Sequence, residues 1–342
     1  MPAEWEPHEA TWIAWPHNRT DWPGKYEPIP FVYAEIVRHL ARVEKVHVLV
    51  NDKTWEDKAR AVLTRCHVGL ENVTFHRWPT NRVWTRDYGP TFVKNTDNET
   101  VAVNWRFNAW AKYEDWKRDD AISLRISRCL NFPVLQPSFT GRRQPVILEG
   151  GSIDVNGCGT LLTTEECLLS RDVQVRNPGA SREELESVFA QYLGTTKVIW
   201  LKRGIAGDDT HGHIDDIARF VAPDMVVAAV ESNPEDANYE PLRENLLQLK
   251  SETDQNGRPL RVVELPMPSP VWFRGQRLPA SYANFYIASG LVLVPTFNDP
   301  NDRIALNTLT ELFPHCAVSG IYCGDLIWGL GAIHCMTQQQ PA

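Results

Sequence analysis

One dense run of the sequence could transfer protons: GDDTHGHIDD, at residues 207–216. If this run is extended, the two-residue alternation of a strand points four of its side chains to one face: Asp209, His211, His213 and Asp215. A histidine beside a carboxylate titrates near neutral pH, which suits general acid and base catalysis. The same residue types also fit a zinc- or manganese-type site, or a solvated polar loop. The run by itself leaves these three interpretations open.

A candidate nucleophile lies near the C-terminus. Cys335 follows the small-residue loop 329–331, which would let the backbone approach a ligand, and precedes the polar run 337–340. A thiol with an ordinary pKa is only a few per cent thiolate at neutral pH, so this role requires a nearby cation or histidine. We interpret the other six cysteines as small buried hydrophobes. Their scatter, without a C-x-x-C pair, indicates free thiols in a reducing compartment.

Two further acids have glycine and aromatic neighbours: Asp87 in WTRDYGP and Glu149 in LEGGS. Together with Asp215 they would place several carboxylates around one thiol, which is costly unless a cation neutralises them. Guanidinium suits this arrangement, because its planar fork pairs with carboxylates while its central carbon stays open to attack. A salt bridge from Asp87 to Arg86 or Arg82, and a loop cap formed by Glu149, are the structural alternatives.

The elements that would position these residues recur along the chain. Apolar residues at three- and four-residue spacings predict five helices: residues 55–66, 121–130, 182–193, 239–249 and 303–313. A short strand follows each helix: 73–78, 133–136, 197–201, 260–265 and 317–322. Four of the units continue into a predicted hairpin: 91–107, 152–163, 217–230 and 284–295. Ser181 with Glu184 has the pattern of a capping box before the third helix.

Units that start about 60 residues apart favour a closed ring, so we predict a five-bladed α/β propeller forming a single catalytic domain, residues 1–342. The missing last hairpin suggests closure by an N-terminal strand at residues 11–15. A further helix and strand, 31–42 and 46–50, precede the first unit and make its boundaries ambiguous. Two independent α/β domains are the alternative. A ring would bring the polar segments to one axial pocket: 84–90, 148–152, 207–216, 279–286 and 329–341.

Composition limits the partners. The 342 residues carry 35 basic and 43 acidic side chains, a formal charge of −8 that disfavours nucleic acid and suits a small cation. The longest apolar runs, 225–230 and 290–295, are far shorter than the roughly 18 residues that span a bilayer, so we expect a soluble protein without membrane partners. The acidic N-terminus has no signal-peptide pattern, which predicts a cytoplasmic location. The oligomeric state stays open.

These motifs, together with the opening PAEWEPHEATWIAWP at residues 2–16, resemble the agmatine deiminase and bacterial-type peptidylarginine deiminase family of guanidine-modifying enzymes. The resemblance spans nearly the whole chain and implies a five-bladed propeller of the pentein type. It further implies that Cys335 is the nucleophile, that His213 is the general acid and base, and that no metal or organic cofactor is required. The other implied site residues are two guanidinium-binding carboxylates, a further acid and a polar contributor: Asp87, Asp215, Glu149 and Asn284. His211 matches no catalytic position.

The implied reaction converts agmatine and water to N-carbamoylputrescine and ammonia, for putrescine and polyamine biosynthesis. A deiminase of free arginine or peptidylarginine that produces citrulline is the first alternative. Two departures from the agmatine deiminase pattern bear on this choice: GLGAIHC stands where GGGNIHC is typical, and Tyr88-Gly89 stands in place of Thr-Gly. We expect these departures to affect selectivity more than catalysis. A metal-dependent hydrolase and a non-catalytic binding propeller are the alternatives from other classes.

Overall fold

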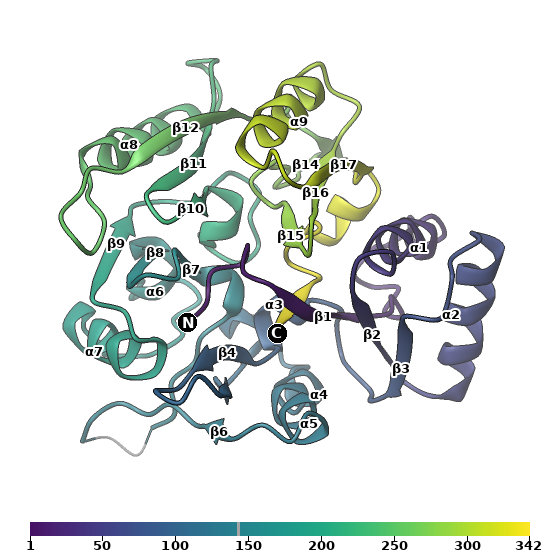
Figure 1. The fold of residues 1–342 in the computed structure, drawn as a ribbon. Helices are drawn as coiled ribbons and strands as arrows, with labels where there is room; N and C mark the ends of the chain where they lie inside the picture. Colours follow the sequence, from purple (N-terminus) through teal and green to yellow (C-terminus); the bar gives the residue numbers. More distant parts are fainter. Residues whose placement is uncertain (142–143) are drawn as a thin grey trace. The chain divides into compact units, whose positions relative to one another are not determined.

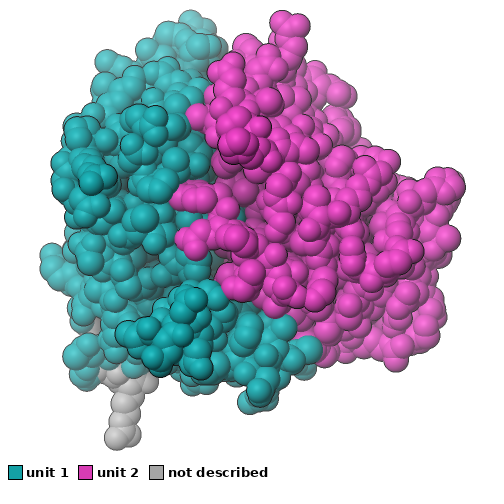
Figure 2. All heavy atoms as spheres, viewed as in Figure 1, with its two compact units in different colours: residues 1–4, 87–266 teal, residues 5–86, 267–342 magenta. Residues whose placement is uncertain are grey.

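The computed structural model describes residues 1–141 and 144–342 (Figure 1). The chain forms two compact units, each built from two stretches of sequence (Figure 2). Unit 1 comprises residues 1–4 and 87–266, and unit 2 comprises residues 5–86 and 267–342. The fold is mixed α/β, and several small sheets carry helices in their connections.

One sheet topology recurs in both units. In unit 1, β10 (Ala218–Ala222) pairs antiparallel with β11 (Met225–Val230). The chain then passes through α8 (Tyr239–Ser251) and returns as β12 (Arg261–Pro266), which pairs parallel with β11. An antiparallel pair is closed by a short turn, whereas the parallel neighbour needs a crossover, here a helix. The helices, strands and hairpins recur as the sequence pattern predicted, but each sheet joins a hairpin to the helix and strand that follow it, whereas the prediction grouped each hairpin with the helix and strand before it.

Unit 1 contains two more copies of this repeat. The first consists of β4 (Thr91–Lys94), β5 (Thr100–Val103), α4 (Lys117–Asp120), α5 (Ile122–Cys129) and β6 (Val134–Leu135). The second consists of β7 (Asp154–Val155), β8 (Thr160–Thr164), α6 (Glu165–Leu168), α7 (Arg182–Leu193) and β9 (Lys197–Leu201). Side chains from both copies form a shared apolar core that includes Val103, Leu161, Phe189 and Trp200.

Unit 2 holds the other two copies. The first consists of β15 (Tyr286–Ala288), β16 (Leu291–Thr296), α9 (Asn301–Leu312) and β17 (Ala317–Tyr322). The second is closed by the two ends of the chain: β18 (Gln338–Pro341) pairs antiparallel with β1 (His8–Ala14), and α1 (Ile29–Leu40) leads to the parallel strand β2 (Lys45–Val50). The predicted closure by an N-terminal strand is therefore confirmed. A two-stranded hairpin, β13 (Trp272–Phe273) with β14 (Gln276–Arg277), lies outside the repeats.

The first repeat was assigned to the wrong helix and strand. The prediction placed residues 55–66 and 73–78 in the repeat and left residues 31–42 and 46–50 as an extra segment. Instead, α1 and β2 belong to the repeat, whereas α2 (Lys53–Arg65) and β3 (Val73–Arg77) extend the sheet by a fourth strand, parallel to β2. Both segments have the same helix-then-strand pattern, and only the pairing of β1 with β18 and β2 distinguishes them.

Two local predictions have different outcomes. The capping box before α7 is confirmed: Ser181 Oγ accepts from Glu184 N at 3.2 Å, and the Glu184 carboxylate accepts from Ser181 N at 2.8 Å. The prediction that six cysteines are buried is confirmed only for Cys167 and Cys323. Cys129 and Cys158 are exposed, and Cys66 and Cys316 are half-buried. All seven cysteines are free thiols.

The polar C-terminal run is a buried strand. Two of its glutamine side chains accept hydrogen bonds through their oxygens: Trp12 Nε1 donates to Gln340 Oε1 at 3.0 Å, and Arg86 Nη1 donates to Gln339 Oε1 at 2.6 Å. Burial of polar side chains is tolerated where such partners exist. Across residues 1–141 and 144–342, we find no helix with both the length and the apolar character needed to cross a bilayer.

Candidate active site

The predicted site residues occupy one position in the repeat. Each lies two to five residues before the first strand of a repeat, β4, β7, β10, β15 or β18. In that order the residues are Asp87, Glu149, His213 with Asp215, Asn284 and Cys335. The helix α3 (Thr85–Tyr88) and short 3-10 turns at 150–152 and 214–216 form part of these segments. The fold thus places one polar residue or pair at the same point of each of the five repeats.

Three of these side chains surround Gly151 in unit 1. A methyl group on Gly151 would lie 2.6 Å from His213 Nδ1, 2.8 Å from Asp87 Oδ1 and 3.1 Å from Asp215 Oδ2. All three side chains are buried. His213 and Asp215 follow Asp87 by 126 and 128 residues in the sequence (213 − 87 and 215 − 87), and the fold brings the three groups together. Only glycine fits here, because the backbone approaches all three groups closely.

Asp87 accepts two hydrogen bonds from within unit 1. Trp110 Nε1 donates to Oδ2 at 2.8 Å, and the Gly151 backbone N–H donates to Oδ1 at 3.1 Å. Burial raises the pKa of Asp87 to about 6; His213 opposes the rise, and the negative charges of Asp215 and Glu149 add to it. Asp87 therefore changes charge close to the pH range in which enzymes work.

Trp110 is held in a strained conformation. It has φ of 58°, between Ala109 and Ala111 with φ of 51° each, so three consecutive non-glycine residues are left-handed. Such backbone costs of order 1–3 kcal/mol per residue and persists where the surrounding structure enforces it. Here the result is an indole N–H directed at Asp87. The sequence alone did not single out Trp110, one of thirteen tryptophans.

Glu149 forms an ion pair with a residue that the sequence also failed to reveal. Arg176 Nε donates to Glu149 Oε1 at 3.2 Å, and neither side chain has exposed surface. Burial favours the neutral acid, but the Arg176 guanidinium and His213 outweigh it and lower the pKa of Glu149. The carboxyl side chain makes no cap to the adjacent 3-10 turn, so the loop-cap alternative is wrong.

His213 lies between two carboxylates. Its Nδ1 is 3.7 Å from Asp87 Oδ1, and its Nε2 is 3.6 Å from Glu149 Oε2. Burial disfavours the imidazolium, but the charge of Asp87, with contributions from Cys167 and Glu149, outweighs burial and raises the pKa of His213 well above 6.5. These charges therefore favour the protonated form of the imidazole.

The run that contains His213 is not extended, which corrects the first interpretation. The Asp208 carboxylate accepts from the backbone N–H of Gly212 at 2.7 Å and of His213 at 3.3 Å, which closes a turn. His211 has φ of 64°, and its Nδ1 lies 3.8 Å from Glu166 Oε1. Asp209 accepts from Tyr113 Oη at 2.7 Å. The four side chains thus do not point to one common face: His213 and Asp215 meet beside Gly151, whereas His211 and Asp209 have other partners, so His211 and His213 do not form a shared metal site.

Cys335 and Asn284 meet in unit 2. Asn284 Nδ2 donates to Cys335 Sγ at 3.1 Å. Asn284 Oδ1 accepts from the backbone N–H of His334 at 3.0 Å and of Cys335 at 3.3 Å. A donor directed at sulfur stabilises the thiolate, because hydrogen bonds to a charged form favour that form. Asn284 therefore holds the backbone at His334 and Cys335 and directs an N–H donor at the sulfur.

The preceding loop is tightly packed. A methyl group on Gly331 would lie 2.7 Å from the Trp84 ring, so Trp84 packs against this backbone. Leu330 has φ of 67°, a conformation that glycine adopts at lower cost. The departures Leu330 and Ala332 from the typical motif thus lie in the loop that carries Cys335.

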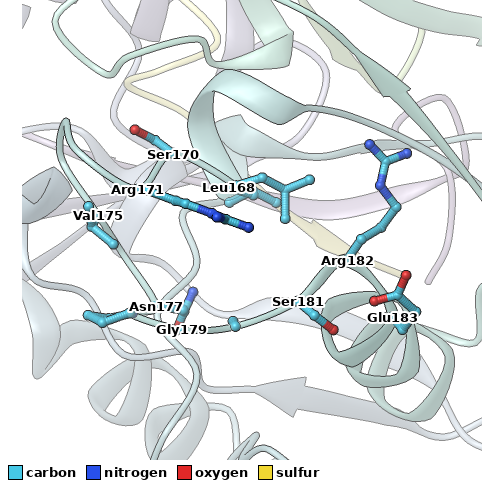
Figure 3. A pocket seen from close by; sticks show the side chains of 12 residues that line it. Leu168, Ser170, Arg171, Val175, Asn177, Gly179, Ser181, Arg182 and Glu183 are labelled. Carbon is cyan, nitrogen blue, oxygen red and sulfur yellow. The ribbon is translucent and has the colours of Figure 1, made fainter.

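A separate surface pocket of unit 1 has a volume of about 690 Å³. It lies beside the start of α7, and its lining includes Leu168, Arg171, Ser181 and Arg182 (Figure 3). Arg182 is paired with Glu165, and Ser181 caps α7. Arg182 and Ser181 therefore have structural partners, and the predicted site residues do not line this pocket.

The α/β fold and its likeness to known enzymes define this protein as a hydrolase of guanidino groups, that is, a guanidine deiminase. The chain belongs to the Porphyromonas-type peptidyl-arginine deiminase family, whose model matches residues 1–341.

Relatives and solved structures match this chain along its full length. The protein described as "Putative agmatine deiminase" in Legionella pneumophila (strain Paris) is 38% identical over 344 residues, which cover 100% of this chain and 95% of the relative. The agmatine deiminase structure from Enterococcus faecalis has 32% identity and a TM-score of 0.90, covering 100% of this chain and 95% of that one. A cysteine-to-serine agmatine deiminase variant from C. jejuni, with substrate bound, has 28% identity and a TM-score of 0.88, covering 100% and 96%.

Proposed function

We propose that this protein is an agmatine deiminase, which hydrolyses agmatine to N-carbamoylputrescine and ammonia for putrescine biosynthesis. The observation that carries the proposal is the buried group around Gly151, where Asp87, His213 and Asp215 converge. Two carboxylates beside a proton donor match the needs of a guanidinium that must be held and then lose ammonia. The formal charge of −8 favours the approach of a dication such as agmatine.

Each site residue has a proposed role. Asp87 and Asp215 bind the guanidinium nitrogens, Cys335 is the nucleophile, and His213 is the general acid and base. Asn284 supports the thiolate through its bond to Cys335 Sγ at 3.1 Å. Glu149, held by Arg176 over 3.2 Å, fixes the imidazole from its Nε2 side.

The reaction proceeds in two halves. The Cys335 thiolate attacks the guanidinium carbon, forming a C–S bond, and the C–N bond to the leaving nitrogen breaks as His213 protonates it, releasing ammonia. His213 then takes a proton from water, and the resulting hydroxide attacks the S-alkylthiouronium carbon. The C–S bond breaks as the C=O bond forms, and the proton of the new hydroxyl passes to solvent. The ureido product leaves and the thiolate is restored. The raised pKa of His213 supports its role as the acid of the first half.

We also propose that residues 1–342 form a single catalytic domain in which the repeats are the blades of a five-bladed α/β propeller. The shared topology of five sheets supports this arrangement. The common position of the site residues, just before the first strand of each repeat, supports it as well. The scattered free thiols favour a cytoplasmic location.

Free arginine or peptidylarginine is the second candidate substrate. Leu330 and Ala332 support this alternative, since they replace the residues typical of agmatine deiminases in the loop before Cys335. Tyr88, which packs edge-on against Phe107 with ring centroids 5.9 Å apart, is the third departure. Both candidates use the same chemistry at the guanidinium, and they differ in the charge and size of the distal group.

The test is release of ammonia and ureido product from agmatine, free arginine and a peptide ending in arginine. Cys335→Ala is expected to reduce turnover by about 10⁶-fold, the effect of removing a catalytic nucleophile, while its melting curve stays unchanged. Cys316→Ala, which removes a half-buried free thiol of the same unit, is the matched control and is expected to keep full activity.

Turnover of agmatine that is lost in Cys335→Ala and is unchanged by EDTA in the wild-type protein would support the proposal. Turnover of arginine or of the peptide alone would keep the mechanism and change the substrate. Activity retained in Cys335→Ala would remove the proposed nucleophile. Loss of activity on chelation would favour metal-dependent hydrolysis, and no release from any substrate would favour a binding module.

A further inference from the structure

A second buried thiol lies beside the proposed general acid and base. In unit 1, Cys167, Glu149 and His213 each offer a ligand atom, and these three atoms lie within 4.8 Å of one another. All three residues are buried, with exposed fractions of 1%, 0% and 1%. The mechanism proposed above has no use for Cys167.

Two of the three residues have atoms without a hydrogen bond. Within residues 1–141 and 144–342, Glu149 Oε2 and both ring nitrogens of His213 have no hydrogen-bond partner, although they are buried. Polar atoms in such a position are costly unless a ligand, ion or water satisfies them. Glu149 Oε2 and His213 Nε2 face each other across 3.6 Å. A sulfur, a nitrogen and an oxygen therefore converge on one buried point.

We infer that Cys167, Glu149 and His213 form a binding site for a zinc-type divalent cation that inhibits the enzyme. Bonds of about 2.0–2.3 Å at a tetrahedral angle place ligand atoms about 3.3–3.6 Å apart. The nitrogen–oxygen pair already has this spacing, and the sulfur, within 4.8 Å of the other two atoms, needs to close by at most about 1.5 Å. Three protein ligands leave a fourth position for water.

The surroundings supply the hydrogen bonds that such a site needs. Asp87 Oδ1 lies 3.7 Å from His213 Nδ1, on the side of the ring away from Glu149, and can accept its proton when Nε2 binds the metal. Arg176 holds Glu149 through Oε1 and leaves Oε2 directed inward. Carboxylate–histidine–metal and ligand–carboxylate contacts of this kind orient the ligands and strengthen binding.

The surface pocket of unit 1 lies beside the segments that carry this cluster. Leu168 and Asn177 line the surface pocket (Figure 3). In the sequence, Leu168 directly follows Cys167, and Asn177 directly follows Arg176, which holds Glu149. The pocket has a volume of about 690 Å³, which is ample for a hydrated ion.

The inhibitory effect rests on the proposed function, whereas metal binding does not. A metal on Nε2 of His213 removes the group that would protonate the departing ammonia and activate water. The site would thus couple turnover to the supply of free zinc. Catalysis itself needs no metal in this scheme.

The experiment measures zinc binding without turnover. The full chain carrying Cys335→Ala, stripped of metal by dialysis against a chelator, is titrated with Zn²⁺ in competition with a chromophoric chelator. We expect one ion per chain. Adding Cys167→Ser should weaken zinc binding by at least about 10- to 100-fold. Loss of a residue that only supports a metal ligand already has an effect of this size, and Cys167 is proposed to be a ligand itself. The matched control Cys129→Ser, an exposed thiol of unit 1, should leave binding unchanged.

Cobalt gives an independent signature that does not depend on the folding of a Cys167 variant. Co²⁺ bound to the Cys335→Ala protein should show a thiolate-to-cobalt charge-transfer band, and a prior addition of one equivalent of Zn²⁺ should abolish it. Absence of stoichiometric zinc, unchanged binding in Cys167→Ser, or absence of the band would each overturn the inference. Zinc bound through Cys167 in a protein that hydrolyses no guanidine would retain the metal site and refute the proposed function.

Discussion

Arg176 and Glu149 form a completely buried ion pair, with Nε and Oε1 3.2 Å apart. The remaining N–H groups of Arg176 reach the backbone carbonyls of Gln174 and Thr210. The pair thus connects three segments of unit 1 and fixes the carboxylate that faces His213 Nε2. Loss of either partner leaves a buried charge without compensation.

We therefore predict that Arg176→Met lowers the free energy of unfolding by about 3–5 kcal/mol, the usual cost of breaking a buried pair. Urea denaturation measures this change. Arg182→Met is the control, because Arg182 also pairs with a glutamate but its side chain is 40% exposed, so its loss should cost about 0–1 kcal/mol. Equal effects of the two substitutions would contradict the prediction.

Gly151→Ala should inactivate the enzyme while leaving most of the fold intact. The added methyl would approach His213, Asp87 and Asp215 to between 2.6 and 3.1 Å, so the three groups must separate. A misplacement of about 1 Å can cost about 10²-fold in rate, and we expect at least this loss in kcat/KM. Gly69→Ala, whose methyl meets only the flexible Glu71 side chain, should be active. A fully active Gly151→Ala enzyme would exclude the cluster as the site.

The pH dependence should show an acidic limb set by Asp87. Its pKa is about 6, and in the proposed mechanism its carboxylate binds the guanidinium. As the pH falls below 6, Asp87 gains a proton, so kcat/KM should fall about tenfold per unit. The guanidinium of the substrate stays charged throughout this range. A rate profile that is flat from pH 7 to pH 5 would contradict this role.

Trp110→Phe should move the acidic limb of the kcat/KM profile to higher pH. The indole N–H stabilises the Asp87 carboxylate, and a hydrogen bond to a charged group contributes about 1.5–3 kcal/mol, so its loss should raise the pKa by about one to two units. Trp105→Phe is the matched control, because the indole N–H of Trp105 donates to the Thr91 hydroxyl and not to Asp87. If both variants keep the wild-type limb, Trp110 does not tune Asp87.

Asn284→Asp should raise the pKa of the Cys335 thiol by more than about one unit. Aspartate can still accept from the backbone N–H groups of His334 and Cys335, but it replaces the donor to sulfur with a negative charge. Alkylation of Cys335 as a function of pH, quantified on its own peptide by mass spectrometry, measures the change. Asn72→Ala, an exposed amide of the same unit, should leave the profile unchanged. An unshifted profile in Asn284→Asp would mean that Asn284 does not support the thiolate.

The sequence determined much of the local structure. Helix α7 and strands β9 and β17 begin and end at the predicted residues, because amphipathic spacing and the Ser181 cap act within a few residues of chain. The types of residue that can do chemistry, a cysteine, a histidine and carboxylates in glycine-rich segments, were visible for the same reason. Short-range pattern therefore gave the elements and the candidate site residues.

Tertiary structure decided which neighbours those residues have. Arg176 and Cys167 lie 27 and 18 residues of sequence from Glu149 (176 − 149 and 167 − 149), and Trp110 lies 23 residues from Asp87. No spacing rule connects these residues with their partners. Their contacts arise from loops folded together in unit 1. Likewise, α1 rather than α2 belongs to the first repeat only because β1 pairs with β18 and β2. Pairing, burial and charge balance depend on groups that are distant in sequence, and only the folded chain brings those groups within reach.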